Sequence, residues 1–425
     1  MPAIKEFGHK TFASLKIRNY RLYFIGRGIS MCGSWMQVVA LGWLVLQLSG
    51  SGSQLGIVLA LQFLPQLLFG PWGGVIVDRF NKRSLIAWTQ GILGVFAIGI
   101  SILIFTDTIQ MWMVYIIALA HGAIRVFDDP ARQTFVSEMV DEAHLKNAVS
   151  LNATENNLAR VAGPSIAGVL IASIGIAFCF LINGISYIAV VAMLFMMRKE
   201  ELRTELPVEK KSGQLTEGFR YVMATPVIRN TLLMMAFIGT FAYEFQVSLP
   251  ILAKSTFNGD AASYAALMTA MGVGAGLGGL YAAGRHKIAP HHLVIFAMLF
   301  GISIVATAFM PTLQLAIFGM FFVGAFSVNL LSLGQTMVQL ESVYEMRGRV
   351  MGLWSAAMVG STSIGGPIIG FIGEHAGGRW GLALGGLVTI LTAGYAAFTL
   401  LKDDILQIIP ESVQLRTEST PDVKL

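Results

Sequence analysis

Ionisable side chains occur inside long apolar runs of this chain, where they are costly to bury. The densest group lies between residues 121 and 132 and consists of His121, Arg125, Asp128, Asp129 and Arg132. An ionisable side chain at the middle of a membrane costs at least ~2.5–3.5 kcal/mol on insertion scales, so each is a functional candidate by default. His121 could relay protons, because imidazole titrates near neutral pH, or it could be a hydrogen-bonded structural residue.

The charges of this group could also neutralise one another along a single helix. Arg125 and Asp129 are four residues apart, and so are Asp128 and Arg132, which places each pair on one helical face. Pro130 lies between them, and a proline inside a helix disturbs the backbone and can release some of these partners. We therefore expect a charge network here, in which Asp128 is a candidate proton carrier.

A polar stripe begins at Arg27. Ser30, Ser34 and Gln37 follow it at positions +3, +7 and +10, which lie on one face of a helix. Such a stripe suits a water-filled pathway, although small serines also pack helices closely together. Arg27 itself could meet an anionic ligand, an acid or a gate.

A third group interrupts the apolar run 147–173 and consists of Glu155, Asn156, Asn157 and Arg160. Glu155 and Arg160 are five residues apart, so they differ by ~140° around a helix and cannot pair within it. Arg160 must therefore find an acid on another helix, and Asp128 is the candidate.

Glu244 lies near the middle of the run 227–253, with no basic residue within two turns of its own helix. Burial disfavours the charged form of a carboxyl group. A carboxyl group of this kind can load and release protons, so Glu244 is the other candidate proton carrier.

The surrounding sequence predicts an all-α integral membrane protein. Of the 425 residues, 55% are apolar and 12% are charged, against roughly 25% charged in an ordinary soluble domain. About twenty apolar residues are needed to cross a bilayer as a helix. We expect twelve such crossings, near 20–48, 53–77, 84–105, 110–137, 147–173, 176–197, 227–253, 261–284, 291–310, 313–340, 350–374 and 380–401.

The distribution of Lys and Arg predicts the orientation of these crossings. Of the 29 basic residues, four lie inside spans, and only Lys254 and Arg379 lie in the odd-numbered connections. Cytoplasmic loops carry the positive excess, so both termini are expected in the cytoplasm of a multi-pass protein of the cell membrane. The net charge of +5 follows from this orientation and does not indicate a nucleic-acid partner.

Signals for cofactor or enzyme chemistry are weak. Cys32 and Cys179 both lie in apolar runs and are not expected to form a disulfide or a metal site. The stretch GAGLGG at 274–279 resembles a dinucleotide-binding loop, but it lies inside a predicted membrane helix with no strand before it. We expect no cofactor, no metal and no enzymatic activity.

The chain also contains an internal repeat. Residues 131–175 lie over 333–377 without a gap, so that Gly175 falls on Gly377. The predicted domains are a six-helix bundle over 1–197, a cytoplasmic linker over 198–226 with an amphipathic helix near 215–223, a second bundle over 227–401 and a disordered tail over 402–425. Parallel repeats of this kind are typical of transporters whose site lies between the bundles.

The repeat also aligns side chains near the centre of each bundle. It places Ser34 and Gln37 over Tyr243 and Gln246, which makes these four and Arg27 the residues expected to face a substrate. Glu244 falls over Trp35 and so could lie beside the pathway, unless it pairs across the interface with Arg27.

A charged cluster follows the second apolar run, in the stretch GGVIVDRFNKRS from Gly73 to Ser84. Its copy in the second half, GGLYAAGRHK at 278–287, has lost the aspartate and the arginine that follows it. The cluster therefore lies at the cytoplasmic end of one half only, which favours a gate over a shared substrate site.

With these residues, the chain resembles the major facilitator superfamily of transporters. Gly74-x-x-x-Asp78-Arg79 followed by Lys82-Arg83 resembles the signature of the loop between helices 2 and 3 of that superfamily. The stretches PARQ (130–133), ARVAGP (159–164) and RGRVM (347–351) resemble the branch of proton-driven exporters of drugs, macrolides and siderophores such as enterobactin. Asn157 and Arg160 match the N-x-x-R pattern of this branch, whereas Glu155 departs from it.

The resemblance implies that Asp78 meets the cytoplasmic start of helix 11 and latches the two halves in one state. A helix N-terminus stabilises an acid by ~0.3–1 kcal/mol, and Arg347 and Arg349 would add to the attraction. In a simpler interpretation, residues 79–83 only anchor the loop on the positive side of the membrane, which fits Lys82 and Arg83 better than Asp78.

We therefore predict a monomeric secondary transporter that exports an amphipathic small molecule in exchange for protons. Asn157 joins the residues that would contact the substrate. Two other functions remain open: proton-coupled uptake of a nutrient or siderophore, and a membrane sensor or partner protein that does not transport. The predicted partners are the small molecule, protons and the lipid bilayer.

Overall fold

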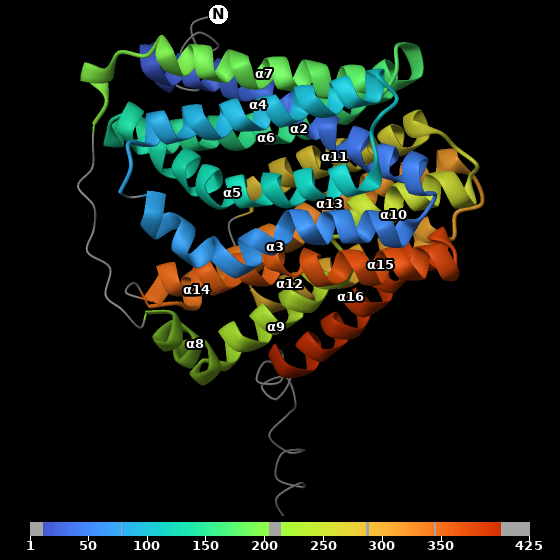
Figure 1. The fold of residues 1–425 in the computed structure, drawn as a ribbon. Helices are drawn as coiled ribbons and strands as arrows, with labels where there is room; N and C mark the ends of the chain where they lie inside the picture. Colours follow the sequence, from blue (N-terminus) through green and yellow to red (C-terminus); the bar gives the residue numbers. More distant parts are fainter. Residues whose placement is uncertain (1–11, 78, 204–213, 286–288, 344–345, 401–425) are drawn as a thin grey trace, which may run out of the picture.

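The computed structural model describes residues 12–77, 79–203, 214–285, 289–343 and 346–400, and these residues are almost entirely helical (Figure 1). Its first half contains η1 (Ala13–Lys16), α2 (Arg18–Ser49), α3 (Gly52–Val77), α4 (Lys82–Phe105), α5 (Met111–Met139), α6 (Glu142–Ser173), α7 (Ala177–Phe195) and η2 (Lys199–Glu201). We call α2–α7 the N set.

The second half begins with α8 (Gln214–Ala224), at the place where the sequence predicts an amphipathic helix near 215–223. The remaining elements are α9 (Pro226–Phe241), α10 (Phe245–Ile251), η3 (Leu252–Thr256), α11 (Ala261–Ala283), α12 (Pro290–Ala308), α13 (Leu313–Glu341), α14 (Arg347–Ser355), η5 (Ala356–Gly360), α15 (Thr362–His375) and α16 (Gly378–Leu400). We call α9–α16 the C set. The predicted tail 402–425 lies outside the described residues.

Within the described residues, eleven helical segments are long and apolar enough to cross a membrane. A helix satisfies its own backbone hydrogen bonds, which is why apolar runs of this length adopt it in lipid. Helix α6 has 32 residues but does not meet the same criterion, because Glu155 and its polar neighbours interrupt it. Its packing between α2 and α11 still makes it the counterpart of the fifth predicted crossing.

The internal repeat is visible in the backbone at two glycines. Gly175 follows α6 with φ 100°, and Gly377 follows α15 with φ 99°. Residues with side chains rarely adopt such angles, so glycine is required at both turns. The alignment of residues 131–175 with 333–377 therefore brings together two turns with the same conformation.

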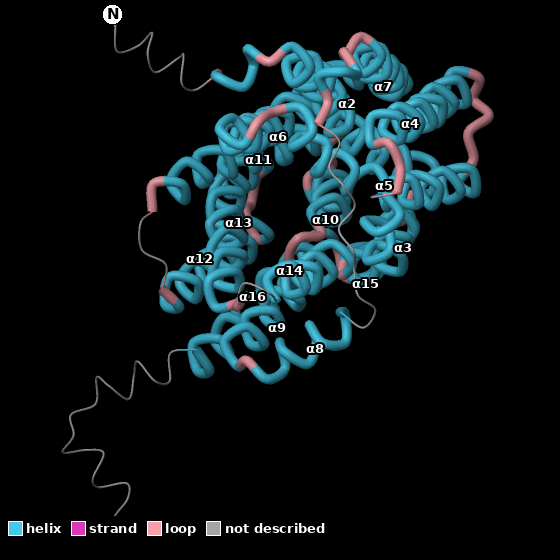
Figure 2. The backbone as a smooth tube through the Cα atoms, turned by 90° about the vertical axis from the view of Figure 1, so that its left-hand side faces the viewer, coloured by secondary structure: helices cyan, strands magenta, loops and turns pink. Residues whose placement is uncertain are grey.

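Each set is held together by its own helix pairs and is joined to the other mainly by two further pairs. In the N set α4 packs on α7 and α2 packs on α6 and α7, while in the C set α11 packs on α13 and α12 on α16. The extensive contacts between the sets run along α3 with α15 and along α6 with α11. Figure 2 looks along the helices and shows α6 and α11 side by side on one side, and α3 and α15 on the other.

The molecule has two ends, which we call the linker end and the far end. The linker end carries η2, α8 and the starts of α4 and α14, and the sequence predicts that it faces the cytoplasm (Figure 1). The far end carries the short turns at residues 50–51, 174–176 and 376–377.

Glycine allows α3 and α15 to approach most closely near the far end. A side chain at Gly56 would overlap the carbonyl oxygen of Gly366, and a Cβ at Gly52 would lie 2.9 Å from the carbonyl oxygen of Gly370. No larger residue fits at Gly56 without separating the helices. This contact therefore holds the far end of the two sets together.

Candidate functional site

A cavity of about 780 Å³ lies between the helices of the N set and one face of the C set. Its walls come from α2, α3, α4, α5, α6 and α7, and from Gln246 on α10. The lining reaches Tyr23, Val136 and Val149, close to the linker end of α2, α5 and α6. The cavity therefore extends from the middle of the molecule toward the linker end.

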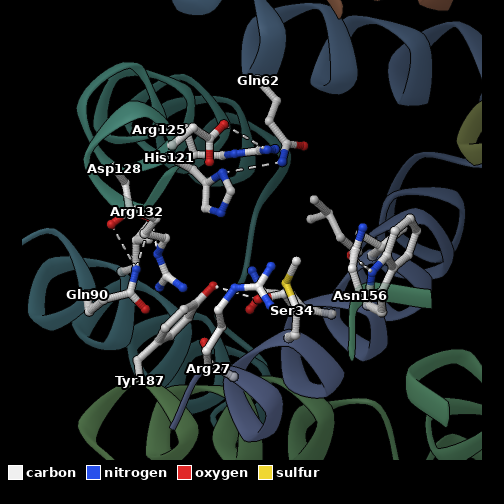
Figure 3. A pocket seen from close by; sticks show the side chains of 18 of the residues that line it. Arg27, Ser34, Gln62, Gln90, His121, Arg125, Asp128, Arg132, Asn156 and Tyr187 are labelled. Atoms are coloured by element: carbon white, nitrogen blue, oxygen red, sulfur yellow. Dashed lines mark hydrogen bonds and ion pairs between the residues drawn. The ribbon is translucent and has the colours of Figure 1, made fainter. Parts of the chain in front are cut away.

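The charged group on α5 forms one wall of this cavity (Figure 3). Asp128 is 4% exposed and accepts hydrogen bonds from Thr89 Oγ1 at 2.5 Å and from Gln90 Nε2 at 3.1 Å. Arg132 Nε donates to Asp128 Oδ2 at 2.7 Å, and Arg125 pairs with Asp129 at 3.0 Å. Both i,i+4 pairs expected from the sequence are thus formed.

His121 lies on the same wall, one turn before Arg125. Its Nδ1 is 3.3 Å from Gln62 Nε2 on α3. Both residues line the cavity. The structural interpretation of His121 as a hydrogen-bonded residue agrees with this contact, while a role in proton relay stays a prediction.

Arg27 pairs with Glu155, which is 7% exposed, and Arg27 Nη1 also donates to the carbonyl oxygen of Asn152 at 3.2 Å. The sequence allowed three partners for Arg27: an anionic ligand, an acid or a gate. The structure provides the acid, which is Glu155 on α6. The possible pair between Arg27 and Glu244 is not formed. Glu155 thus compensates Arg27 from another helix, which the sequence could not show because the two residues are far apart along the chain.

The pair predicted between Arg160 and Asp128 is not formed either. Asp128 is already bonded to α4 and to Arg132, and the Arg160 guanidinium instead lies over the Trp35 ring, 5.1 Å from its centroid. The prediction was wrong because the i,i+4 neighbour of Asp128 takes its carboxylate first. Arg160 is therefore left without a carboxylate partner among the described residues.

The residues expected to face a substrate divide into two groups. Arg27, Ser34, Gln37 and Gln246 line the cavity, whereas Tyr243 and Asn157 are not among its lining residues. Ser34 lies 3.3 Å from the Tyr187 hydroxyl, and Gln37 Oε1 accepts from Asn183 at 2.5 Å. Tyr243 donates its hydroxyl to the carbonyl oxygen of Ser327 at 2.9 Å, which anchors it inside the C set.

Several polar residues of the cavity were not predicted from the sequence. These are Gln62, Gln90, Asn152 and Tyr187, and Asn156 was noted without a role. Gln62 and Gln90 lie in apolar helices, and a polar side chain within a predicted span was the signal that could have identified them.

Glu244 lies beside the cavity and not in it. It is 2% exposed and occupies the break between α9 and α10, where the backbone leaves the helical conformation with ψ 39°. Its side chain bonds to Thr362 of α15, while its Oε1 is buried without a hydrogen-bond partner. A Cβ at Gly365 would lie only 3.0 Å from that oxygen, so Glu244 packs directly against α15.

The residues of the predicted gate lie at the linker end. Gly74 lies in α3, Asp78 lies outside the described residues, and Arg79 is exposed. Arg347 Nε donates to the Gln339 carbonyl oxygen at 2.9 Å, and Arg349 pairs with Glu217 of α8 at 2.8 Å. Neither arginine contacts the N set through a bond of the described residues, so the predicted latch with Asp78 stays a prediction.

Lys82 and Arg83 do more than anchor the loop on the positive side of the membrane, which was the simpler interpretation of these residues. Both are 8% exposed, Lys82 pairs with Glu138 at 2.8 Å, and Arg83 donates to the Leu194 carbonyl oxygen at 2.7 Å. They join α4 to α5 and to α7. Both side chains therefore brace the N set internally, and neither is free to bind lipid headgroups.

A helical membrane protein with two sets of helices around a cavity of charged, polar and apolar side chains has the architecture of a transporter. The family described as "Transmembrane secretion effector", of the major facilitator superfamily, matches residues 9–412, and the chain belongs to this family. It is a secondary transporter and a multi-pass membrane protein, not an enzyme.

Curated relatives match most of the chain at low identity. It is 26% identical over 377 residues to the "Uncharacterized MFS-type transporter YfiS" of Bacillus subtilis, covering 85% of this chain and 87% of the relative. It is 24% identical over 390 residues to the "Enterobactin exporter EntS" of Salmonella choleraesuis, covering 88% of this chain and 92% of the relative.

The fold also matches a solved transporter structure. A bacterial homolog of the human lysosomal transporter Spinster, in an inward-facing and unoccupied conformation, superimposes with a TM-score of 0.71 at 15% identity. The match covers 91% of this chain and 97% of the other. At this identity the likeness establishes the fold alone.

Proposed function

We propose that the protein exports an amphipathic small molecule, a drug or a siderophore, in exchange for protons. The observation that carries the proposal is the position of Glu244: a buried carboxyl group with one unpartnered oxygen, packed against the helix that closes the far end. The cavity supplies a binding site of mixed polar and aromatic lining. The enterobactin exporters among the relatives support export of a siderophore.

Glu244 is placed where its charge can act on the far end. It contacts α15 at Gly365 and Thr362, and the next residue, Gly366, is in close contact with Gly56 of α3. Protonation of Glu244 neutralises a buried carboxylate that lies next to the contact between Gly366 and Gly56. Protonation would therefore stabilise the state in which α3 and α15 are packed together, and release would favour their separation.

Transport requires that proton and substrate bind the two states with different affinity. In the present state the far end is closed and the cavity reaches the linker end. A substrate would enter the cavity from the linker end, and deprotonation of Glu244 would accompany opening of the far end. Asp128 stays the second candidate proton carrier, although its carboxylate already has three partners.

The test is flux in proteoliposomes under an imposed pH gradient, with enterobactin and the amphipathic dye ethidium as the two probes. We expect Glu244→Gln to reduce proton-driven flux at least tenfold, while exchange of the probe down its own gradient persists. Asp128→Asn should have a smaller effect on coupling. Glu341→Gln is the matched control, because Glu341 is an exposed residue of α13 at the linker end.

Three results would contradict the proposal. Full proton-driven flux in both Glu244→Gln and Asp128→Asn would remove the coupling assignment. Flux only in the direction of uptake would favour the nutrient or siderophore importer, and complete absence of flux of both probes in wild-type protein would favour a sensor or partner protein.

A further inference from the structure

Arg160 differs from every other arginine around the cavity. Arg27 pairs with Glu155, Arg125 with Asp129 and Arg132 with Asp128. Within the described part of the chain, Arg160 has no carboxylate partner, and its buried Nε atom has no hydrogen-bond partner. A guanidinium group carries its charge at any accessible pH, so it cannot avoid this cost by losing a proton.

The position of Arg160 makes the missing partner more costly. It lies 13 residues before Ser173, the end of α6, which corresponds to about 20 Å along the helix. This places the guanidinium near the middle of the membrane, where a charge is least stable. A charge held at this depth without an anionic protein partner points to an anion that arrives from outside.

Arg160 is not itself a lining residue of the cavity, but two lining residues lie next to it. Trp35 lines the cavity, and the Arg160 guanidinium lies over the Trp35 ring, with Arg160 Cζ 5.1 Å from the ring centroid. Asn156 also lines the cavity, lies one turn before Arg160 on α6, and accepts from Trp35 Nε1 at 3.5 Å. Figure 3 places Asn156 on the opposite side of the cavity from Asp128 and Arg132.

We propose that Arg160 and Trp35 form a subsite for an anionic group carried on an aromatic ring, as in an aryl carboxylate or an aryl sulfonate. The planar guanidinium group can donate two parallel hydrogen bonds to such an oxyanion. The Trp35 ring, which already holds Arg160 by a cation–π contact, offers its surface to the aromatic ring of the ligand. This inference rests on the proposed transport function and names its substrate class.

The subsite also lies where the two sets meet. The carbonyl of Arg160 packs against Gly272 of α11, in the C set. An anion bound here would neutralise a charge at the interface between α6 and the C set. Substrate binding would thereby change the stability of the interface along which the sets must move.

The experiment compares two probes that share one ring system and differ in charge. Dansylate is an anionic naphthalenesulfonate, and dansylamide is its neutral counterpart. Binding is measured in neutral detergent by energy transfer from tryptophan to the dansyl group, and flux is measured separately in proteoliposomes. Wild-type protein should bind dansylate at least tenfold more tightly than dansylamide.

Substitutions then test whether Arg160 causes the preference for dansylate over dansylamide. Arg160→Gln should remove the preference for dansylate and leave dansylamide affinity within about twofold, whereas Arg160→Lys should retain part of it because it keeps the charge. Arg285→Gln is the matched control, since Arg285 also lies over an aromatic ring, at 4.6 Å from the Phe296 centroid, but Phe296, unlike Trp35, does not line the cavity. It should leave the preference unchanged.

Thermal unfolding separates this role from a structural one. Removing an unpaired charge from the membrane interior should leave the Tm of ligand-free protein unchanged or raise it, whereas a structural arginine would lower it. A clear fall in Tm for Arg160→Gln, or equal or absent binding of both probes in wild type, would overturn the subsite. Selective binding of dansylate without any proton-driven flux would uphold the subsite and contradict the transport proposal instead.

Discussion

The far end and the linker end both carry charged residues, but they use them in opposite ways. At the far end, Glu374 of α15 accepts from Ser51 Oγ at 2.7 Å and from the Ser53 backbone N–H at 2.9 Å, and so binds the start of α3. Lys254 of η3 donates to the Leu46 carbonyl oxygen at 2.8 Å, near the end of α2. Both bonds join the C set to the N set.

At the linker end, the charged residues bond within their own set or to the linker. Arg83 donates to α7, Lys82 pairs with α5, and Arg349 pairs with Glu217 of α8. The described residues at this end form no hydrogen bond or ion pair between the N set and the C set. In this conformation the sets are therefore joined by these far-end bonds and by the contact between Ser165 Oγ of α6 and Thr269 Oγ1 of α11, at 3.0 Å, in the far half of the molecule.

The signs of the two far-end charges explain why these contacts are favourable. A helix carries partial positive charge at its N-terminus and partial negative charge at its C-terminus. The carboxylate of Glu374 lies at the N-terminus of α3, and the ammonium of Lys254 lies at the C-terminal end of α2. The C set thus holds both ends of the α2–α3 turn with charges of the appropriate sign.

The largest expected effect comes from the glycine contact beneath these charges. In Gly56→Ala, the new methyl group would overlap the Gly366 carbonyl oxygen, so α3 and α15 must separate. Overpacking of this kind costs about 1–3 kcal/mol, which should open the far end and reduce transport more than tenfold. Accessibility of a cysteine introduced at Ser51 to a membrane-impermeant maleimide measures the opening.

The matched control for this substitution is Gly99→Ala in α4. A Cβ at Gly99 meets nothing within 4 Å, so this variant should transport like wild type. Wild-type accessibility and transport in Gly56→Ala would show that the far end does not depend on close packing of α3 and α15.

A smaller effect is expected from the charge at the far end. Glu374→Gln removes the anion from the N-terminus of α3 but keeps an acceptor, and the site is exposed, so the loss should be about 1 kcal/mol. The balance of states should shift about fivefold toward an open far end, measured by the distance between spin labels on α3 and α15. Lys254→Gln should act in the same direction, whereas a shift toward closure in either variant would contradict the assignment.

How far the sequence could predict this architecture depends on the range of the interactions. Apolar runs and linker composition are local signals, so the helix bounds and α8 agree with the structure within a few residues. The i,i+4 pairs of Arg125 and Asp128 were predictable for the same reason. The far-end bonds were not, because Glu374 and Ser51 are 323 residues apart and each looks like an ordinary exposed loop residue.

The site illustrates the same limit. Unusual residues in apolar runs identified Arg27, Asp128, Arg160 and Glu244, but not their partners. Each cation has several acids at comparable depth in the membrane, and only the rotation and tilt of the helices decide between them. The pairing of Arg27 with Glu155, and the isolation of Arg160 on Trp35, became visible only once α2 and α6 were placed side by side.

The smallest expected effect is at the linker end, and it shifts the balance of conformations in the opposite direction from Glu374→Gln. If Asp78 meets the start of α14 when the linker end closes, Asp78→Asn removes an attraction of ~0.3–1 kcal/mol from that state only. The balance should shift about twofold toward the conformation described here, which Glu374→Gln disfavours. Asp107→Asn at the far end is the matched control, and spin labels on α3 and α14 at the linker end provide the measurement.

Further variants test whether Arg349 changes its partner between the two states. Arg349 bonds to Glu217 in the present state, and the same side chain would approach Asp78 when the linker end closes. Glu217→Gln therefore removes a contact of the open linker end alone and should oppose the effect of Asp78→Asn, while Arg349→Gln removes a contact from both states and should change the balance least. Equal shifts in all three variants would show that Arg349 does not exchange partners between Glu217 and Asp78.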